Sequence, residues 1–270
     1  MPAVDLVVTD LDGTLWAHEG LVHERVLSAW STITASGVPI LVATGRRRKS
    51  TANPLAALGL APPAVLLDGA IGIDLATARR FHTRAAGPVT AKALLAAFAD
   101  HGLSPVVYVD GRDADVFVST APSTHPGHLA LFGADARVGD LDEVVATESV
   151  LAFGLVGVDC TVAKAVAATV VEAGLGEARV NPSFDFDGCA LTVVTPGLSK
   201  WDGVLAYCDD AGIDPDRLLA IGDGSNDIEL LANAKISCSL EGSSAVAIDA
   251  ADYLVGPVGS GGWADIVAFL

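Results

Sequence analysis

Near its N-terminus the chain reads Val4-Asp5-Leu6-Val7-Val8-Thr9-Asp10-Leu11-Asp12-Gly13-Thr14-Leu15-Trp16. Residues 6–8 form a short apolar run, which is typical of a buried parallel strand. Asp10 and Asp12 follow this run at once, and open α/β folds hold their ligands at the carboxyl ends of such strands. Two carboxylates this close repel each other unless a cation lies between them or one is protonated. The first option predicts a hard metal ion bound by oxygen, and the other reading of Asp-x-Asp is an Asp-rich turn.

The composition of the chain indicates a globular protein. It has 270 residues, of which 51% are hydrophobic and 18% charged, so a large core is expected and disorder is not. The net charge is −17, which argues against binding to nucleic acid or to an anionic membrane surface. No apolar run is long enough for a membrane span. An anionic substrate would need local positive charge to reach a site on this chain.

The location of the protein is predicted to be cytoplasmic. The N-terminus lacks a basic segment followed by an apolar one, so no signal peptide is expected. The cysteines are scattered and show neither metal-ligand spacing nor a disulfide framework; they are Cys160, Cys189, Cys208 and Cys238. We expect reduced, mostly buried thiols.

The alternation of helices and strands predicts a doubly wound, mostly parallel α/β sheet. Residues 23–36 carry apolar residues at helical spacing and end at Gly37. A buried strand is expected at residues 38–43, followed by a helix through about residue 58. Further strands of this sheet are expected at residues 64–67, 218–221, 235–238 and 252–255.

Residues 84–195 read as a separate α/β module inserted into this sheet domain. Helices are expected at residues 91–101 and 162–173. Strands are expected at residues 105–109, 115–119, 149–158, 178–181 and 189–195. The predicted domains are therefore a core of residues 1–83 and 196–270 and an insert of residues 84–195.

Two polar clusters of the insert resemble metal sites only weakly. Asp110, Asp113 and Asp115 lack the rest of a calcium-loop pattern and are expected to be solvated turn acids. His125 and His128 flank Pro and Gly, so they are expected in a loop, with no Cys or further His nearby to complete a metal site.

Three more strand or helix ends of the core carry polar residues suited to chemistry. Thr44 and Gly45 follow a strand, and a hydroxyl with backbone N–H groups at a helix start can bind an anion, although such a Thr can also be a plain cap. Lys200 opens a helix, where a cation is unfavourable for the helix dipole unless it is placed for a purpose. Residues 222–227, Gly-Asp-Gly-Ser-Asn-Asp, follow a strand and precede a helix, which also fits a simple capping turn.

Taken together, these stretches resemble the four motifs of the haloacid dehalogenase (HAD) superfamily. The string Asp-Leu-Asp-Gly-Thr-Leu of residues 10–15 is similar to motif I, Thr44 to motif II, Lys200 to motif III and residues 222–227 to motif IV. The string Ala-Thr-Gly-Arg of residues 43–46 resembles the Cof-type subfamily, and the insert resembles its C2-type cap. Two positions depart from the pattern, because Asp68 replaces the usual Asn and Trp201 replaces the usual Gly.

The resemblance implies a role for each matching residue. Asp10 would be the nucleophile and Asp12 the general acid and base, with Thr44 and Lys200 completing the catalytic set. The residues implied in binding the substrate phosphate are Thr44, Gly45, Arg46, Lys200 and Asn226. The implied cofactor is Mg²⁺, with ligands from Asp10, Asp12 (through its backbone carbonyl), Asp223 and Asp227.

The function implied by the resemblance is that of a Mg²⁺-dependent phosphatase with an aspartyl-phosphate intermediate. Its substrate would be a small phosphorylated metabolite. Sugar phosphates are the class expected first, and flavin or pyridoxal phosphates are the next. The alternatives are a phosphomutase of the same superfamily and a non-catalytic protein that binds a phosphorylated ligand. The protein is expected to be a monomer or a homodimer.

Overall fold

The computed structural model of the chain describes residues 4–18, 20–111, 114–183 and 186–270. The chain folds into two compact units, Met1–Thr83 with Ser199–Leu270, and Arg84–Leu198. The second unit occupies the segment for which the sequence predicts a cap. Its C-terminal boundary lies at residues 198/199 instead of 195/196, immediately before the helix that begins at Lys200.

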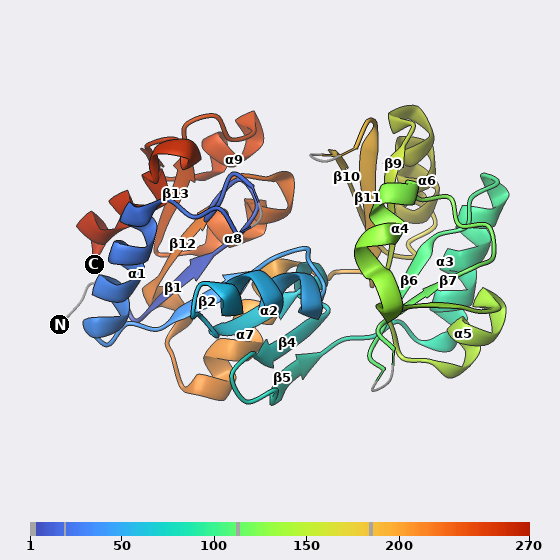
Figure 1. Ribbon diagram of the computed structural model, residues 1–270, viewed down its shortest axis with the longest axis horizontal. Coiled ribbons are helices and arrows are strands. Elements are labelled where there is room, and N and C mark those ends of the chain that lie inside the picture. The colour runs from blue at the N-terminus through green and yellow to red at the C-terminus, as the bar shows by residue number, and fades with distance from the viewer. Residues whose placement is uncertain (1–3, 19, 112–113, 184–185) are drawn as a thin grey trace. The chain divides into compact units, whose positions relative to one another are not determined.

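The first unit contains an eight-stranded sheet in the order β14-β13-β12-β1-β2-β3-β4-β5 (Figure 1), counted over the described residues. Its strands are β1 (Leu6–Thr9), β2 (Ile40–Ala43), β3 (Pro63–Leu66), β4 (Ile71–Asp74), β5 (Arg80–Thr83), β12 (Leu218–Gly222), β13 (Ile236–Leu240) and β14 (Tyr253–Val255). All neighbours from β14 to β3 run parallel. The doubly wound, mostly parallel sheet predicted from the sequence is confirmed.

Helices cover both faces of the central strand β1, because alternate residues of a strand point to opposite sides. The helices of this unit are α1 (Glu24–Ala35), α2 (Arg48–Ala57), α7 (Lys200–Ala211), α8 (Ile228–Asn233), α9 (Ala245–Ala250) and the 3-10 segment η6 (Gly262–Phe269). On one side, Leu6 and Val8 share a buried cluster with Val204 of α7. On the other side, the indole N–H of Trp263 donates to the Thr9 hydroxyl at 2.8 Å. This packing fixes the strand whose end carries Asp10.

The hairpin β4–β5 extends the sheet antiparallel to β3, and the sequence offered no assignment for it. Both strands are short, and β4 contains Gly72, which is a poor strand former. The glycine is needed because its position lies under the ring of Phe81. A Cβ on Gly72 would stand 2.1 Å from the Phe81 ring.

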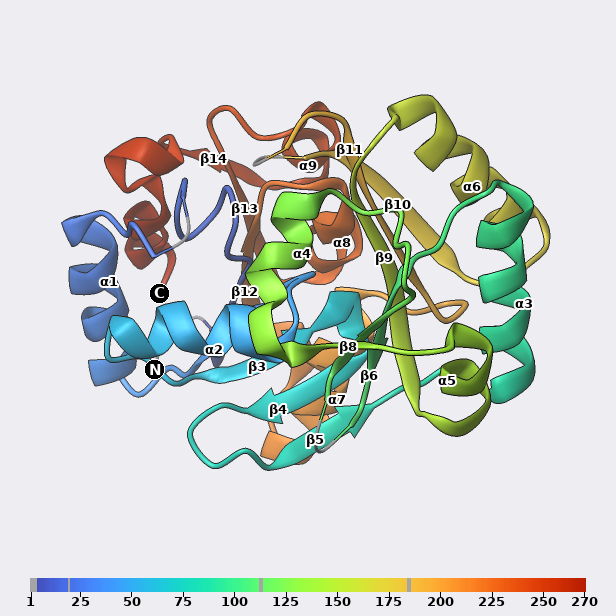
Figure 2. The ribbon, with the colours of Figure 1, turned by 45° about the vertical axis from the view of Figure 1, so that its right-hand side comes forward.

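The second unit is built on a six-stranded, mostly antiparallel sheet in the order β10-β11-β9-β6-β7-β8 (Figure 2), counted over the described residues. Its strands are β6 (Val106–Val109), β7 (Val116–Val118), β8 (Ala136–Val138), β9 (Val150–Val158), β10 (Glu177–Pro182) and β11 (Cys189–Val194). Its helices are α3 (Pro88–Asp100), α4 (Pro126–Phe132), α5 (Leu141–Thr147) and α6 (Cys160–Glu172). Helices α3, α5 and α6 pack on one sheet face in one apolar cluster, whereas Phe132 of α4 belongs to another.

Helix α4 corrects the expectation of a loop at His125 and His128. His125 is the N-cap and accepts a hydrogen bond from the Gly127 N–H at 3.0 Å. The ring of His128 pairs with the Thr124 hydroxyl at 2.9 Å. Pro126 stands at the first helical position, where it is compatible with a helix start. Of the acidic turn, Asp113 lies outside the described residues.

The cysteines differ from the prediction of four reduced thiols. Cys160, the first residue of α6, and Cys189, the first residue of β11, form a disulfide across 29 residues of sequence. Cys208 and Cys238 are buried free thiols. Sequence spacing could not reveal the pair, because the contact arises only where α6 and β11 come together in the second unit. Within the described residues, no helix is both long and apolar enough to cross a membrane.

The disulfide predicts the thiol count of the purified protein. Denatured without reductant, the chain should present two free thiols, from Cys208 and Cys238, and four after reduction. Titration with a thiol reagent measures both counts. Four free thiols in protein purified under air would show that Cys160 and Cys189 remain reduced. A Cys160→Ser variant serves as the control. It leaves Cys189 unpaired and should therefore present three free thiols without reductant.

Candidate active site

The site lies at the carboxyl ends of three adjacent parallel strands. Asp10 directly follows β1, Thr44 follows β2 and Asp223 follows β12, and these strands are neighbours in the order β12-β1-β2. Parallel strands end at one edge of a sheet, so residues from positions 10, 44 and 223 are brought together although they are far apart in the sequence.

Lys200 is the centre of this site. Its side chain is fully buried, and its ammonium group donates to Asp10 Oδ1 at 2.8 Å and to Asp227 Oδ1 at 2.7 Å. Burial by itself lowers the pKa of a lysine, but the carboxylates of Asp10, Asp227 and Asp68 outweigh it and raise the pKa of Lys200. The carboxylates around Lys200 favour its charged form, which explains why a cation is tolerated at the start of α7.

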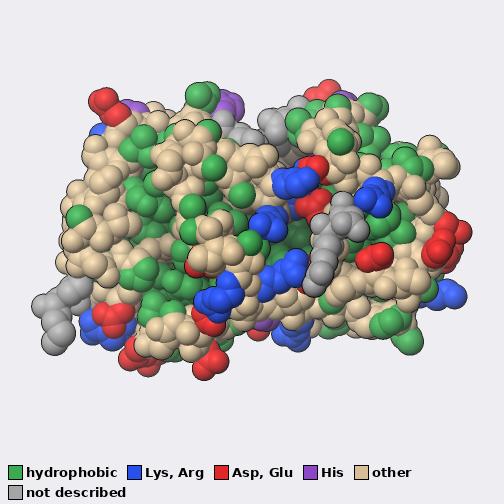
Figure 3. Space-filling view, turned by 60° about the horizontal axis from the view of Figure 1, so that its bottom comes forward, with side chains coloured by type: hydrophobic (Ala, Val, Ile, Leu, Met, Phe, Trp, Pro, Cys, Tyr) green, Lys and Arg blue, Asp and Glu red, His purple; other side chains and the backbone are tan. Residues whose placement is uncertain are grey.

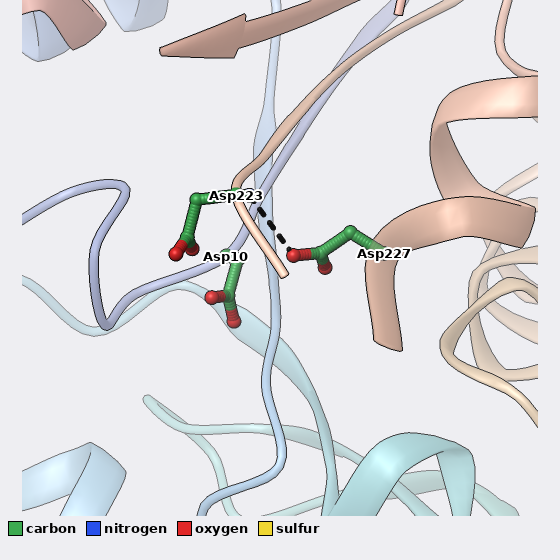
Figure 4. A group of neighbouring side chains, drawn as sticks. All are labelled: Asp10, Asp223 and Asp227. Carbon is green, nitrogen blue, oxygen red and sulfur yellow. Dashed lines mark hydrogen bonds between the residues drawn. The ribbon is translucent and has the colours of Figure 1, made fainter. Parts of the chain in front are cut away.

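Asp223 and Asp227 are held by a tight turn after β12. The Asp227 carboxylate accepts hydrogen bonds from the backbone N–H groups of Asp223 at 3.1 Å and Gly224 at 3.0 Å. Asp223 Oδ1 accepts from the Thr14 hydroxyl at 2.8 Å. Figure 4 shows the carboxylates of Asp10, Asp223 and Asp227 gathered at one place. Backbone and hydroxyl donors thus fix these acids before any ligand binds.

The charges of this group fit a divalent cation. Asp10, Asp223 and Asp227 can each offer an oxygen within 4.8 Å of the others, and Lys200 is the ammonium that contacts two of them. Burial raises the pKa of Asp10 and Lys200 lowers it, but burial is the larger effect. The pKa of Asp10 therefore stays well above its usual value. Burial and the neighbouring Asp227 raise the pKa of Asp223 to about 6. Burial disfavours the charged form of both acids and the neighbouring carboxylates add to this effect, and a hard divalent ion with oxygen ligands would offset both.

Asp12 is bound by Arg46. Its two carboxylate oxygens accept hydrogen bonds from Arg46 Nε at 2.5 Å and Nη2 at 2.7 Å. The sequence predicted Arg46 as a ligand of the substrate phosphate, and the structure places its guanidinium on Asp12. Trp16, which the sequence gave no reason to single out, donates its indole N–H to the same carboxylate at 2.9 Å.

Thr44, Gly45 and Asn226 lie around Asp68, the position that departs from the Cof-type pattern. Asn226 donates to Asp68 Oδ1 at 2.9 Å, and a Cβ on Gly45 would stand 3.2 Å from the same oxygen. Thr44 is buried, and its hydroxyl accepts from the Arg46 N–H at 3.2 Å. Asp68 has φ 51° and is 3% exposed, so its carboxylate is fixed at the site. The sequence had left its direction open.

Gly13 offers a test of how Asp223 is placed. Gly13 has φ +78°, and a Cβ there would stand 2.3 Å from Asp223 Oδ2. We expect Gly13→Ala to displace Asp223 and to weaken Mn²⁺ binding by about tenfold or more. Electron paramagnetic resonance of free Mn²⁺ measures the affinity. Gly37→Ala is the matched control, because Gly37 has φ +87° but nothing within 4 Å; equal losses in both variants would attribute the effect to backbone strain.

The raised pKa of Asp223 predicts a pH dependence of metal binding. A metal ion binds the deprotonated carboxylate, so protons compete with it below the pKa of about 6. Affinity for Mg²⁺ should be nearly constant above that pH and should fall by roughly tenfold per pH unit below it. Isothermal titration calorimetry across this range measures the change. An affinity that stays level through pH 6 would contradict the placement of Asp223 at the ion.

Comparison with known proteins finds a phosphatase among the relatives of this chain. The chain is 25% identical over 232 residues to the phosphoglycolate phosphatase of Methanopyrus kandleri, covering 85% of this chain and 81% of that protein. It is also 46% identical over 50 residues to the chloroplastic endoribonuclease YBEY of Arabidopsis thaliana, but these span 18% of this chain and only 9% of that relative. The chain also matches the phosphoglycolate phosphatase of Methanoculleus marisnigri, but the match spans only 29% of that protein's length.

The fold itself is shared with solved structures. A structure described as the HAD subclass IIB sugar phosphatase BT4131 superposes with a TM-score of 0.78, at 20% identity and 98% coverage of both chains. The sequence profile of the haloacid dehalogenase-like hydrolases matches residues 7–267, nearly the whole chain. The family predicted from the four motifs is thereby confirmed, and the chain belongs to the haloacid dehalogenase-like hydrolases.

Proposed function

We propose that this protein is a Mg²⁺-dependent phosphatase that hydrolyses a small phosphorylated metabolite through an aspartyl phosphate on Asp10. The observation that carries the proposal is the buried ion pair of Asp10 with Lys200, 2.8 Å apart, beside the carboxylates of Asp223 and Asp227. Lys200 opposes the effect of burial on Asp10 and so favours the ionised carboxylate, which is the form that attacks as a nucleophile. A structural ion pair would not need two further acids at the same sheet edge.

Asp10 would act as the nucleophile and Asp12 as the general acid and base. An oxygen of Asp10 attacks phosphorus, the bond from phosphorus to the leaving oxygen breaks, and that oxygen takes a proton from Asp12. In the second step water attacks phosphorus and gives its proton to the Asp12 carboxylate. The bond between phosphorus and Asp10 then breaks, and inorganic phosphate leaves.

Positive charge and fixed donors would stabilise the phosphoryl group during transfer. Lys200 contributes a buried ammonium, and Thr44 and Gly45 lie at the end of the neighbouring strand β2. Mg²⁺, held by Asp10, Asp223 and Asp227, would supply charge neutralisation between the nucleophile and the phosphate. Lys and Arg side chains are present on the face drawn in Figure 3, although the net charge is −17. Local cations can therefore attract an anion to this acidic protein.

The substrate class rests on the relatives. The Methanopyrus kandleri relative is named a phosphoglycolate phosphatase, and the superposed structure is described as a sugar phosphatase. We propose small phosphorylated metabolites, with sugar phosphates first and phosphoglycolate included in the assay panel. Release of inorganic phosphate from such a panel identifies the substrate, and retention of the phosphate on a product would indicate a phosphomutase.

The cytoplasm remains the proposed compartment, and monomer or homodimer the proposed assembly. The Cys160–Cys189 disulfide bears on the compartment, because disulfides are uncommon in reducing compartments. The thiol count of protein trapped inside cells by rapid alkylation would decide whether the bridge forms there.

Asp10→Asn tests the nucleophile. Asn keeps the size of the side chain but cannot accept the phosphoryl group, so hydrolysis of 4-nitrophenyl phosphate with Mg²⁺ should fall by about a thousandfold or more. Release of nitrophenolate measures it. The control is Asp249→Asn, since Asp249 is exposed on α9. Turnover of the Asp10 variant near the wild-type rate would remove Asp10 as the nucleophile.

A further inference from the structure

Arg46 and Trp16 form a clamp on the carboxylate of Asp12. Arg46 contacts both oxygens, with Nε at 2.5 Å from Oδ2 and Nη2 at 2.7 Å from Oδ1. The Trp16 indole N–H reaches Oδ1 at 2.9 Å. The Arg46 guanidinium carbon also lies 5.5 Å from the centre of the Trp16 ring, within the range of a cation–π contact. The two clamp residues therefore support each other as well as Asp12.

The clamp is itself anchored at both ends. Arg46 Nη1 donates to the Ser50 carbonyl in the first turn of α2 at 2.9 Å, and its backbone N–H donates to the Thr44 hydroxyl. Trp16 is 1% exposed, so its ring cannot turn freely. In contrast, the Asp12 side chain remains 34% exposed. Asp12 is thus fixed in direction yet accessible to water and to a leaving group.

This geometry leaves little reason to treat Arg46 as a phosphate ligand. A guanidinium recognises a phosphate best by its paired N–H groups, and on Arg46 the pair formed by Nε and Nη2 is already on Asp12. Its remaining nitrogen, Nη1, contacts the Ser50 carbonyl. The side chain is 18% exposed, so it is also less accessible than the carboxylate it holds.

We infer that Arg46, with Trp16, is a positioning residue that sets the direction of the Asp12 carboxylate for proton transfer. The inference rests on the proposed function, in which Asp12 gives a proton to the leaving oxygen and later takes one from water. Arg46 would then affect the reaction only through Asp12. Lys could keep the charge, but it cannot contact both oxygens in a fixed plane.

Two aryl esters that differ by a single nitro group separate this role from phosphate binding. Phenolate is a much stronger base than 4-nitrophenolate, so phenyl phosphate depends on a proton from Asp12 far more than 4-nitrophenyl phosphate does. A residue that binds the phosphoryl group affects both esters alike. A residue that positions Asp12 affects phenyl phosphate more.

The experiment measures phenol or nitrophenol release in a single turnover, with enzyme in excess over ester and with Mg²⁺. This step reports transfer to Asp10 and is independent of the later hydrolysis. The variants are Arg46→Lys and Trp16→Phe, which removes the indole donor and keeps a ring. Arg48→Lys is the matched control, because Arg48 belongs to the same basic run and is exposed. Circular dichroism melting verifies that each variant is folded.

In Arg46→Lys, the rate ratio of phenyl to 4-nitrophenyl phosphate should fall by about tenfold or more relative to wild type. Trp16→Phe should lower the ratio as well, but by a smaller factor. If Arg46→Lys does not fold, the ratio measured for Trp16→Phe tests the inference in its place. Arg48→Lys should leave the ratio unchanged. Equal losses on both esters, or no loss on either, would overturn the role of Arg46. Wild-type protein inactive on both esters would overturn the proposed function itself, and this inference with it.

Discussion

A buried ammonium group is the interaction on which the site depends. Lys200 is enclosed at the start of α7 and bonded to Asp10 after β1 and to Asp227 before α8. Removing a charge from water is costly unless opposite charge and hydrogen bonds replace the lost hydration. The lysine therefore requires both carboxylates, and their own burial requires the lysine. This mutual need holds three separated segments of the chain at one sheet edge.

The two acids of the first strand end are kept apart by two different cations. Asp10 pairs with Lys200, whereas Asp12 pairs with Arg46. The sequence alone left open whether a shared cation or a proton relieves their repulsion. In the structure each acid has its own basic partner, so Asp10 can be buried while Asp12 is partly exposed. Different environments are what allow neighbouring carboxylates to take different roles.

Several features lay outside the reach of local sequence patterns. The hairpin of residues 71–83 is short and contains Gly72, whose place under Phe81 becomes evident only in the folded sheet. The Cys160–Cys189 pair and the Asp12–Trp16 contact depend on which surfaces meet, which spacing does not reveal. Asp68 was visible as an unusual residue, but its contact with Asn226 is set by a loop in the left-handed conformation.

The sequence by itself determined the parallel sheet, the family and the set of acids at the strand ends, because apolar runs and the residues that follow them are local signals. The tertiary structure decided how those residues pair: Lys200 with Asp10 and Asp227, and Arg46 with Asp12. The reason is that electrostatic partners are chosen by distance and burial in three dimensions. Residues 34 positions apart, as for Arg46 and Asp12, or 190 apart, as for Lys200 and Asp10, become neighbours only when strands β1 and β2 and helix α7 assemble.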